Sequence, residues 1–329
     1  MRKISKILSL ITAAALALSL TACGNNDTQD KSSGKDDGTY TVGVCQLVQH
    51  SAHDEATRGF IDALNGALPG KVTVNSQTAS NDIAACSGIV NNFIAEEVDL
   101  IMANATPALQ ISSAATEKIP ILGTSITDYA AALGIEDFDG TVGGNISGTS
   151  DLAPLKVQAQ MVSEWFPDAK TIGMLYCSAE ANSQYQVKVV AKELEAMGYT
   201  CKNYSFTDSN DLTSVLQGAV TACDVIYVPT DNTVASNGSI IDNICRPEGI
   251  PVIGGEEGIC DTCSVASTTI SYYDLGVKTG QMAAKILTGE ADISEMPIEY
   301  ADYSFIYNPE ICNALGLTPP SGEYKAIGE

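Results

Sequence analysis

The chain has 329 residues, a length that suits two α/β domains or one large one. Hydrophobic residues make up 45% of it and charged residues 17%, which is enough apolar material for a full core and excludes global disorder. The 40 acidic and 17 basic residues give a formal net charge of −23, and such a negative field excludes most non-specific binding to nucleic acids or anionic lipids.

The N-terminal segment has the features of a lipoprotein signal peptide. A basic start is followed by the apolar run 7–20, which is too short to span the roughly 30 Å core of a bilayer. Residues 20–23 (LTAC) match a bacterial lipobox, where the chain is cut before the cysteine and the thiol carries a lipid. We therefore predict a signal peptide over residues 1–22, a lipid anchor at Cys23 and a disordered tether over residues 23–38. A plain signal peptide with an incidental cysteine is the alternative.

Beyond the tether, short β-branched runs alternate with amphipathic stretches in two similar arrays. The first array has predicted strands at 41–45, 71–75, 98–102 and 119–123, and predicted helices at 54–68, 81–97 and 106–116. The second has predicted helices at 153–166, 182–197, 212–221 and 232–244, and predicted strands at 171–176, 200–206, 224–228 and 250–254. This alternation, with nearly continuous apolar strands, predicts parallel sheets with helices on both faces.

The sequence therefore predicts an α/β fold of two doubly wound parallel-sheet lobes. The Gly- and Thr-rich segment 140–150 suits a hinge between them, and helix 273–287 and the extended stretch 299–307 are expected to return to the lobes. This gives a hinge with several crossings. We expect lobe 1 to hold residues 39–147 and 274–297, and lobe 2 to hold residues 148–273 and 298–329.

Ligands of open parallel sheets bind at the carboxyl ends of strands, so the mostly polar residues at and after the ends of the predicted strands are candidate site residues. In lobe 1 these are Gln46, His50, Ala105, Thr106, Thr124 and Ser125. In lobe 2 they are Ser178, Asn182, Ser183, Asp231, Asn232 and Glu256. Thr106 is expected to cap a helix whose N–H groups can hold a carboxylate, and Asp231 is the expected partner of a ligand ammonium. Capping alone is the alternative for each single residue, whereas the whole set indicates a polar cleft.

Other chemistries find little support in the sequence. It contains no GxSxG, HExxH, P-loop or Rossmann glycine motif, so we predict no enzyme, and we predict no metal or cofactor. Cys45, Cys177 and Cys223 adjoin predicted strands and are expected to be buried as small apolar residues. For the single CxxC pair, Cys260 and Cys263, we expect free thiols, with a local disulfide or a metal site as alternatives.

At the strand ends the sequence resembles the ABC-transporter substrate-binding lipoproteins of the tryptophan/phenylalanine-binding type. The resemblance extends over about residues 40–320. Its motifs are 42–46 (VGVCQ) with His50 and Asp54, 105–110 (ATPALQ), 124–128 (TSITD), 171–176 (TIGMLY), 178–183 (SAEANS), 228–236 (VPTDNTVAS) and 274–276 (DLG). The sequence departs from the pattern at 49–51 (QHS), where the family often has Glu-His-Pro, and at 254–258 (GGEEG) with the CxxC that follows.

The resemblance implies a type I periplasmic-binding-protein fold. It also implies capture of a free amino acid, expected to be aromatic, and its delivery to a membrane permease driven by a cytoplasmic ATPase. Thr106 and Ser125 would hold the α-carboxylate, and Asp231 the α-ammonium. The other implied lining residues are Gln46 and His50 from lobe 1 and Asn182 and Ser183 from lobe 2. An acid at Glu256 would select a phenol hydroxyl, an indole N–H or a cationic side chain.

We thus expect an extracytoplasmic, lipid-anchored monomer that binds an amino acid and no nucleic acid. A ligand-sensing receptor domain, or a binder of a nucleoside or a sugar, are the alternatives. Trp165, the only tryptophan, lies at a predicted helix end and is expected to pack in the core, which disfavours a sugar site built on tryptophan.

Overall fold

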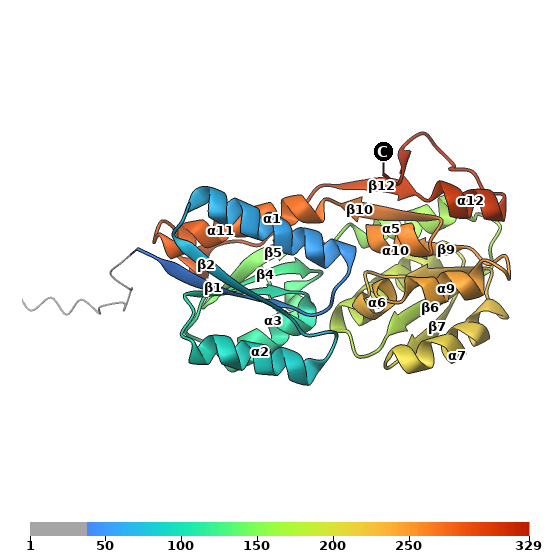
Figure 1. Ribbon diagram of the computed structural model, residues 1–329. Helices are drawn as coiled ribbons and strands as arrows, with labels where there is room; N and C mark the ends of the chain where they lie inside the picture. The colour runs from blue at the N-terminus through green and yellow to red at the C-terminus, as the bar shows by residue number, and fades with distance from the viewer. Residues whose placement is uncertain (1–37, 329) are drawn as a thin grey trace, which may run out of the picture. The chain divides into compact units, whose positions relative to one another are not determined.

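The computed structural model describes residues 38–328. The predicted signal peptide (1–22), the predicted lipid anchor Cys23 and the predicted tether up to residue 37 lie outside this part of the chain. The described residues form an α/β fold with two separate sheets (Figure 1). Within residues 38–328, no helix is both long and apolar enough to cross a membrane.

Sheet 1 has six strands, all parallel, in the order β11-β5-β4-β3-β1-β2. These are β1 (Tyr40–Gln46), β2 (Val72–Thr78), β3 (Leu100–Asn104), β4 (Ile121–Ile126), β5 (Ile146–Ser150) and β11 (Glu299–Tyr300). Its helices are α1 (Ser51–Ala67), α2 (Ile83–Ala95), α3 (Thr106–Ala115), α4 (Tyr129–Leu133) and α11 (Tyr272–Leu287), with the short 3-10 helix η1 (Ile293–Glu295). Sheet 1 and these helices are called lobe 1.

Sheet 2 has seven strands in the order β13-β12-β10-β9-β8-β6-β7, all parallel except the pair of β10 and β12. These are β6 (Thr171–Cys177), β7 (Thr200–Phe206), β8 (Val225–Val228), β9 (Val252–Gly254), β10 (Ala266–Ile270), β12 (Tyr303–Tyr307) and β13 (Tyr324–Ala326). Its helices are α5 (Leu155–Trp165), α6 (Ala181–Ala196), α7 (Ser209–Val220), α8 (Asn232–Ala235), α9 (Gly238–Cys245), α10 (Glu257–Thr262) and α12 (Pro309–Leu315). Together they are called lobe 2.

Each sheet is buried on both faces, which explains its apolar strands. In sheet 1, Val42 and Val44 of β1 pack with side chains of α1 and α11, while Cys45 packs with side chains of α2 and α3 on the other face. Lobe 2 repeats the pattern, with one core toward α5 and α6 and the other toward α7 and α9. Trp165 lies in the first of these cores, edge-on to Tyr324 at 5.3 Å between ring centroids, as expected for a packing residue. Cys45, Cys177 and Cys223 are buried as predicted.

The helix pair α1 and α11 approaches closely because small residues lie at its contact. A Cβ on Gly59 would stand 2.1 Å from the Tyr273 carbonyl oxygen, and a Cβ on Gly276 would stand 2.0 Å from the Ala56 carbonyl oxygen. Any side chain at either position would therefore push the helices apart. In Figure 1 the two helices lie side by side. Their contact holds the start of α11 next to the start of α1.

The chain crosses between the sheets after β5, after β10 and between β11 and β12, which confirms the predicted two-lobed fold with a multi-crossing hinge. The details differ from the expectation at three places. Residues 146–150 of the predicted hinge form β5, a central strand of sheet 1. The expected lobe boundary at residue 147 therefore falls inside a strand. The stretch 299–307 is divided between β11 in sheet 1 and β12 in sheet 2, so the boundary expected at 298 lies a few residues too early.

The predicted helix 232–244 is two helices, α8 and α9. The break occurs at Asn237, whose side-chain amide donates to the Thr233 carbonyl and so competes with helix continuation. Further elements lie outside the predicted set, namely α4, α10, α12, β10 and β13.

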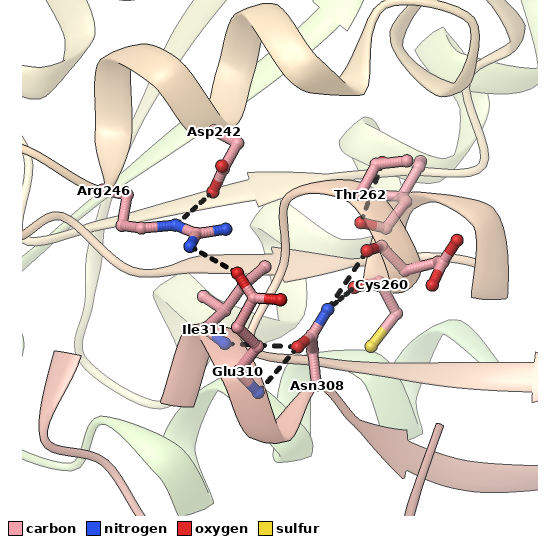
Figure 2. A network of polar contacts seen from close by, with 9 residues as sticks. Asp242, Arg246, Cys260, Thr262, Asn308, Glu310 and Ile311 are labelled. Atoms are coloured by element: carbon pink, nitrogen blue, oxygen red, sulfur yellow. Dashed lines mark hydrogen bonds and ion pairs between the residues drawn. The ribbon is translucent and has the colours of Figure 1, made fainter. Parts of the chain in front are cut away.

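The last helix of lobe 2 is fixed by a polar network (Figure 2). The amide of Asn308, just before α12, donates to the carbonyl oxygens of Cys260 and Asp261 at 3.0 and 3.1 Å. Arg246 at the end of α9 pairs with Glu310 of α12 at 2.9 Å. These contacts tie α12 to α9 and α10, so the returning segment is an integral part of lobe 2. Cys260 and Cys263 are buried free thiols.

Candidate functional site

A small pocket lies between residues of the two lobes. Lobe 1 and the hinge contribute His50, His53, Ser125, Thr127, Asp151 and Tyr272. Lobe 2 contributes Asn182, Thr230, Asp231, Asn232, Ala235 and Glu256. All except Ala235, the last residue of the short helix α8, lie at or just beyond carboxyl ends of strands or at helix starts, as the strand-end rule predicts. Among residues 38–328, the lining holds three carboxyl groups and neither lysine nor arginine.

Four lining side chains have buried polar atoms without a hydrogen-bond partner within residues 38–328. These atoms are Ser125 Oγ, Asp151 Oδ1, Asn182 Oδ1 and both ring nitrogens of His50. An unpaired buried polar group is costly, and folded proteins carry few of them. Their gathering around one pocket indicates a surface prepared for a polar ligand.

Backbone strain marks the same region of lobe 1. Ser125 near the end of β4 has φ 55°, and Ala105 directly after β3 has φ 98°. Both values lie in the left-handed region that non-glycine residues rarely adopt, and such strain collects at functional sites. The unusual conformation places Ser125 on the pocket, whereas Ala105 is buried against Leu47 and Val48 behind it.

Asp151 directly follows β5, where the chain makes the first of its three crossings between the sheets. Its Oδ2 accepts a hydrogen bond from the hydroxyl of Tyr272, the first residue of α11, at 3.1 Å, while Oδ1 is unpaired. Burial raises the pKa of Asp151 to about 6, because removal from water disfavours the charged form. Neither Asp151 nor Tyr272 is among the site residues predicted from the sequence.

Asp231 and Glu256 are helix caps as well as lining residues. Asp231 accepts from the backbone N–H of Cys177 at 2.7 Å and of Val234 at 2.9 Å. Burial, together with the nearby carboxylate of Glu180, raises the pKa of Asp231 to about 8. Glu256 caps α10 through two backbone N–H groups, and burial raises its pKa to about 7. Asp231 and Glu256 are therefore both helix caps and pocket-lining residues.

Glu180 holds the lobe 2 side of the pocket in place from behind. Its carboxylate is 4% exposed and accepts five hydrogen bonds. The donors are the backbone N–H and amide of Asn232, at 3.0 and 2.7 Å, the N–H and hydroxyl of Thr233, at 2.9 and 2.8 Å, and the amide of Asn182, at 3.2 Å. The carboxylate therefore orients both lining asparagines. Glu180 belongs to the motif 178–183 but is not among the site residues predicted from the sequence.

The two histidines line the pocket together, with ring centroids 3.9 Å apart. Burial lowers the pKa of His50 to about 4, and it lowers the pKa of His53 well below the usual range. Both rings are therefore neutral at neutral pH and add no positive charge to the acidic pocket. His53 is fixed by a 3.1 Å contact between Nδ1 and the Val48 carbonyl oxygen.

Six predicted site residues do not line this pocket: Gln46, Ala105, Thr106, Thr124, Ser178 and Ser183. The side chain of Gln46 is bonded to Asp54 and Thr57 of α1, at 2.7 Å in each case. Ser178 is exposed and donates to the Phe206 carbonyl. Thr106 is buried in the first turn of α3, and Ser183 is buried behind Asn182 and accepts from its amide.

Thr124 belongs to a cluster of threonine hydroxyls in the interior of lobe 1. Its Oγ1 lies 3.2 Å from Oγ1 of Thr149 on β5 and 3.2 Å from Oγ1 of Thr279 on α11. These contacts join three elements of the lobe, so Thr124 has a structural role there. The other six predicted residues, His50, Ser125, Asn182, Asp231, Asn232 and Glu256, do line the pocket.

Comparisons with known proteins agree with this architecture. The model of the family described as ABC transporter substrate binding protein matches residues 41–322. A relative from Clostridioides difficile (strain R20291), called tyrosine-binding protein, is 33% identical over 332 residues, covering 98% of this chain and 96% of that one.

Two solved structures are also similar. The ABC domain in complex with L-Trp from Streptococcus pneumonia is 29% identical, with a TM-score of 0.83 over 88% of this chain and 99% of that one. The ligand-free, open structure of a substrate-binding protein with adhesive properties from Clostridium difficile is 35% identical, with a TM-score of 0.67 and the same coverage.

Proposed function

We propose, since this chain belongs to the ABC transporter substrate-binding protein family, that it captures a free aromatic amino acid in the pocket between its lobes. Proteins of this family act outside the cytoplasmic membrane. Two relatives support the aromatic ligand, because one is called tyrosine-binding and the other was solved with L-Trp. The bound amino acid passes to a membrane permease driven by a cytoplasmic ATPase.

The observation that carries the proposal is the charge of the pocket. In the part of the chain that the structure describes, three buried carboxyl groups line the pocket and no cationic side chain does. A ligand ammonium pairs with these groups and favours their ionised form, whereas a neutral sugar or nucleoside brings no such charge. The unpaired oxygens of Asp151 and Asn182 come from opposite lobes and are both acceptors, as an ammonium requires.

Asp151 is the main ammonium partner in this proposal, and Asp231 supports it. Both oxygens of Asp231 already accept backbone N–H groups, although each keeps a second lone pair. Asp151 has one oxygen without any partner, and Tyr272 holds the other in a fixed orientation. The carboxylate that approaches the ammonium most directly is therefore the one that follows β5.

The α-carboxylate of the ligand would meet the donors of lobe 1. The hydroxyl of Ser125 is unpaired and can donate, and a neutral His50 ring can donate from one nitrogen. The aromatic side chain would lie against the rings of His50 and Tyr272, and Glu256 would receive a phenol hydroxyl or an indole N–H. Thr106, which does not line the pocket, would support the carboxylate site from the first turn of α3.

The same proposal covers the parts of the chain outside residues 38–328. Cys23 carries the lipid that tethers the protein to the cell membrane, and the tethered protein works as a monomer that binds without catalysis. Replacement of Cys23 by alanine should release the protein from the membrane fraction, and retention of the variant on membranes would contradict the anchor.

The experiment that tests the ligand chemistry is calorimetric titration of ligand-stripped protein with tyrosine and two analogues. Tyramine lacks the carboxylate, and 3-(4-hydroxyphenyl)propionate lacks the ammonium. Loss of a partner for a buried charge costs about 2–5 kcal/mol, so each analogue should bind at least 30-fold more weakly than tyrosine. The propionate should be the weaker, since its carboxylate enters an acidic pocket. Equal binding of the propionate and tyrosine would contradict the proposal.

A further inference from the structure

Two buried thiols meet inside lobe 1, away from the pocket. The sulfur atoms of Cys45, on β1, and Cys86, on α2, are 3.3 Å apart. Both side chains are fully buried in the core between sheet 1 and α2. Both are free thiols in the structure. The residues are 41 positions apart in the sequence, so a bond between them would close a long loop that contains α1 and β2.

We propose that Cys45 and Cys86 form an oxidisable dithiol, a modification site at which a disulfide joins β1 to α2. Sulfur atoms in a disulfide lie about 2.05 Å apart, so the pair needs to close by roughly 1 Å. Such a movement is within the reach of side-chain and helix adjustments. An extracytoplasmic protein meets oxidants that a cytoplasmic one does not, which gives the pair an environment in which to react.

The start of α2 provides access to the buried pair. Cys86 lies in the first turn, and the residues from 81 to 85 are exposed, with Ile83 55% exposed. Just before the helix, Ser80 and Asn81 have φ values of 54° and 62°, a conformation that costs energy for non-glycine residues. Helix ends open locally at small cost, and a strained connection adds to this tendency. A small oxidant can therefore reach Cys86 without global unfolding.

The environment of the pair also prepares one thiol to react. A hydrogen bond from Cys45 lowers the pKa of the Cys86 thiol, and the same bond raises the pKa of Cys45. Cys86 is thus the thiol that more readily becomes the nucleophilic thiolate.

Hydrogen peroxide is an oxidant of the right size, and the reaction balances in two steps. The Cys86 thiolate attacks one peroxide oxygen, the O–O bond breaks, and after protonation Cys86 is a sulfenic acid and one water has formed. The Cys45 sulfur then attacks the Cys86 sulfur, the S–O bond breaks, and a second water leaves with the proton of Cys45. Two thiols and one peroxide give one disulfide and two waters.

The test is peptide mapping of the purified full-length protein after treatment with hydrogen peroxide under native conditions. Trypsin places Cys45 in the peptide 36–58 and Cys86 in the peptide 72–118, so the disulfide appears as these two peptides joined. The expected result is this joined pair at about 2 Da less than the sum of the two reduced peptides, and its loss on reduction. The crosslinked protein should melt on the order of 5 °C higher, because the bond restricts the unfolded chain.

Two variants give the matched controls. Cys45→Ala should lose both the joined peptides and the rise in melting temperature, whereas Cys201→Ala, at a half-buried thiol on β7, should keep both. Peptide mapping of the oxidised wild-type protein tests the proposal by itself. A folding defect in Cys45→Ala would therefore not invalidate the test. Peptides that keep Cys45 and Cys86 as thiols after Cys201 has been oxidised would overturn the proposal. So would further oxidation of Cys86 to its sulfinic acid, or pairing of either cysteine elsewhere.

Discussion

Asp151 combines an unpaired buried oxygen with a hydroxyl that holds it in place, so its replacement tests the pocket at the scale of one residue. Asp151→Asn keeps the shape and removes the charge. We expect tyrosine affinity to fall about 30- to 1,000-fold, because the ligand ammonium loses its closest counter-charge. Calorimetric titration measures the change. Asp137→Asn, at an exposed position, is the control and should bind as the wild type does.

The melting temperature separates Asp151 from Asp231. Without ligand, Asp151→Asn should melt at or above the wild-type temperature, since a buried charge without a full set of partners destabilises the fold. Asp231→Ala should lose affinity and also melt lower, because it removes the cap of α8 and an acceptor for Cys177. Wild-type affinity in Asp151→Asn would show that Asp151 has no contact with the ligand.

Glu180 is a positioning residue, and Glu180→Gln is the conservative way to test it. A glutamine side chain presents an NH₂ group to donors from Asn232 and Thr233, so at least one buried donor loses its acceptor. We expect tyrosine affinity to fall about 10-fold or more, together with a lower melting temperature. Glu180→Asp keeps the charge and should recover part of the affinity. Unchanged binding in Glu180→Gln would contradict the positioning role.

At the scale of the element, the contact between α1 and α11 depends on glycines. Gly59→Ala would place a Cβ on the Tyr273 carbonyl oxygen, so we expect a loss of about 1–3 kcal/mol in the free energy of unfolding. Gly66→Ala on the same helix meets open space and should be neutral or slightly stabilising. Chemical denaturation of the two variants measures both values. Similar stabilities would show that the close approach is not needed.

Asp151 and Tyr272 were not predicted as site residues because the strands before them were not predicted. Three strands lie outside those that the sequence predicts: β5 (ISGTS), β10 (ASTTI) and β13. The first two are rich in hydroxyl residues although every residue in them is buried. Their hydroxyls are bonded inside the protein, as when Thr149 meets Thr279 and Thr269 donates to Glu257. Asp151 directly follows β5, and Tyr272 follows β10 by one residue. Because β5 and β10 lack an apolar run, the strand-end rule, which found six of the twelve lining residues, could not reach these two. His53, Thr127, Thr230 and Ala235 also line the pocket and were not predicted.

The better-predicted parts have strong local signals. The strands β1, β3, β4, β6, β8 and β9 have apolar runs, and the residues at or after the ends of most of these strands include His50, Ser125, Asn182, Asp231, Asn232 and Glu256. Gln46, Thr124 and Ser183 stand at equivalent strand or helix ends but point into the protein interior. The sequence pattern places a residue at the end of a strand, and only packing decides whether it faces the ligand or the core.

At the scale of the whole molecule, one polar chain links the lobes. The amide of Asn81 in lobe 1 donates to the hydroxyl of Thr233 at 3.1 Å, and that hydroxyl donates to Glu180. Such a contact favours the arrangement in which both lobes meet the ligand. We expect Asn81→Ala to weaken tyrosine binding about 3- to 10-fold, the effect of one hydrogen bond. Affinity equal to that of the wild type would show that this contact is not part of the ligand-bound arrangement.

The acidic pocket also predicts how stability depends on pH. Asp151, Glu256 and Asp231 have pKa values raised to about 6, 7 and 8, so their protonation stabilises the folded state and this contribution is lost as pH rises through those values. His50 and His53 act in the opposite sense, but only below the usual histidine pKa of about 6.5. Between pH 6.5 and 8.5 the melting temperature of ligand-free protein should therefore fall by about 5 °C.

Ligand binding should show the reverse dependence over the same range. An ammonium binds ionised carboxylates, so the rise in melting temperature caused by tyrosine should grow as pH increases from about 6 to 8. Differential scanning calorimetry with and without tyrosine measures both trends. A ligand-free melting temperature that rises with pH would contradict the account of the buried acids.

The most direct test of an aromatic amino-acid receptor is thermal melting of ligand-stripped protein against all twenty amino acids, together with nucleosides and sugars. A ligand that binds only the folded state raises the free energy of unfolding by mass action, by about 2.7 kcal/mol at a concentration 100 times its Kd. The melting temperature rises accordingly. We predict a selective rise with tyrosine, tryptophan or phenylalanine and none with the neutral solutes. A rise with a nucleoside or a sugar and with no amino acid would contradict the assignment of the acidic pocket to a ligand ammonium.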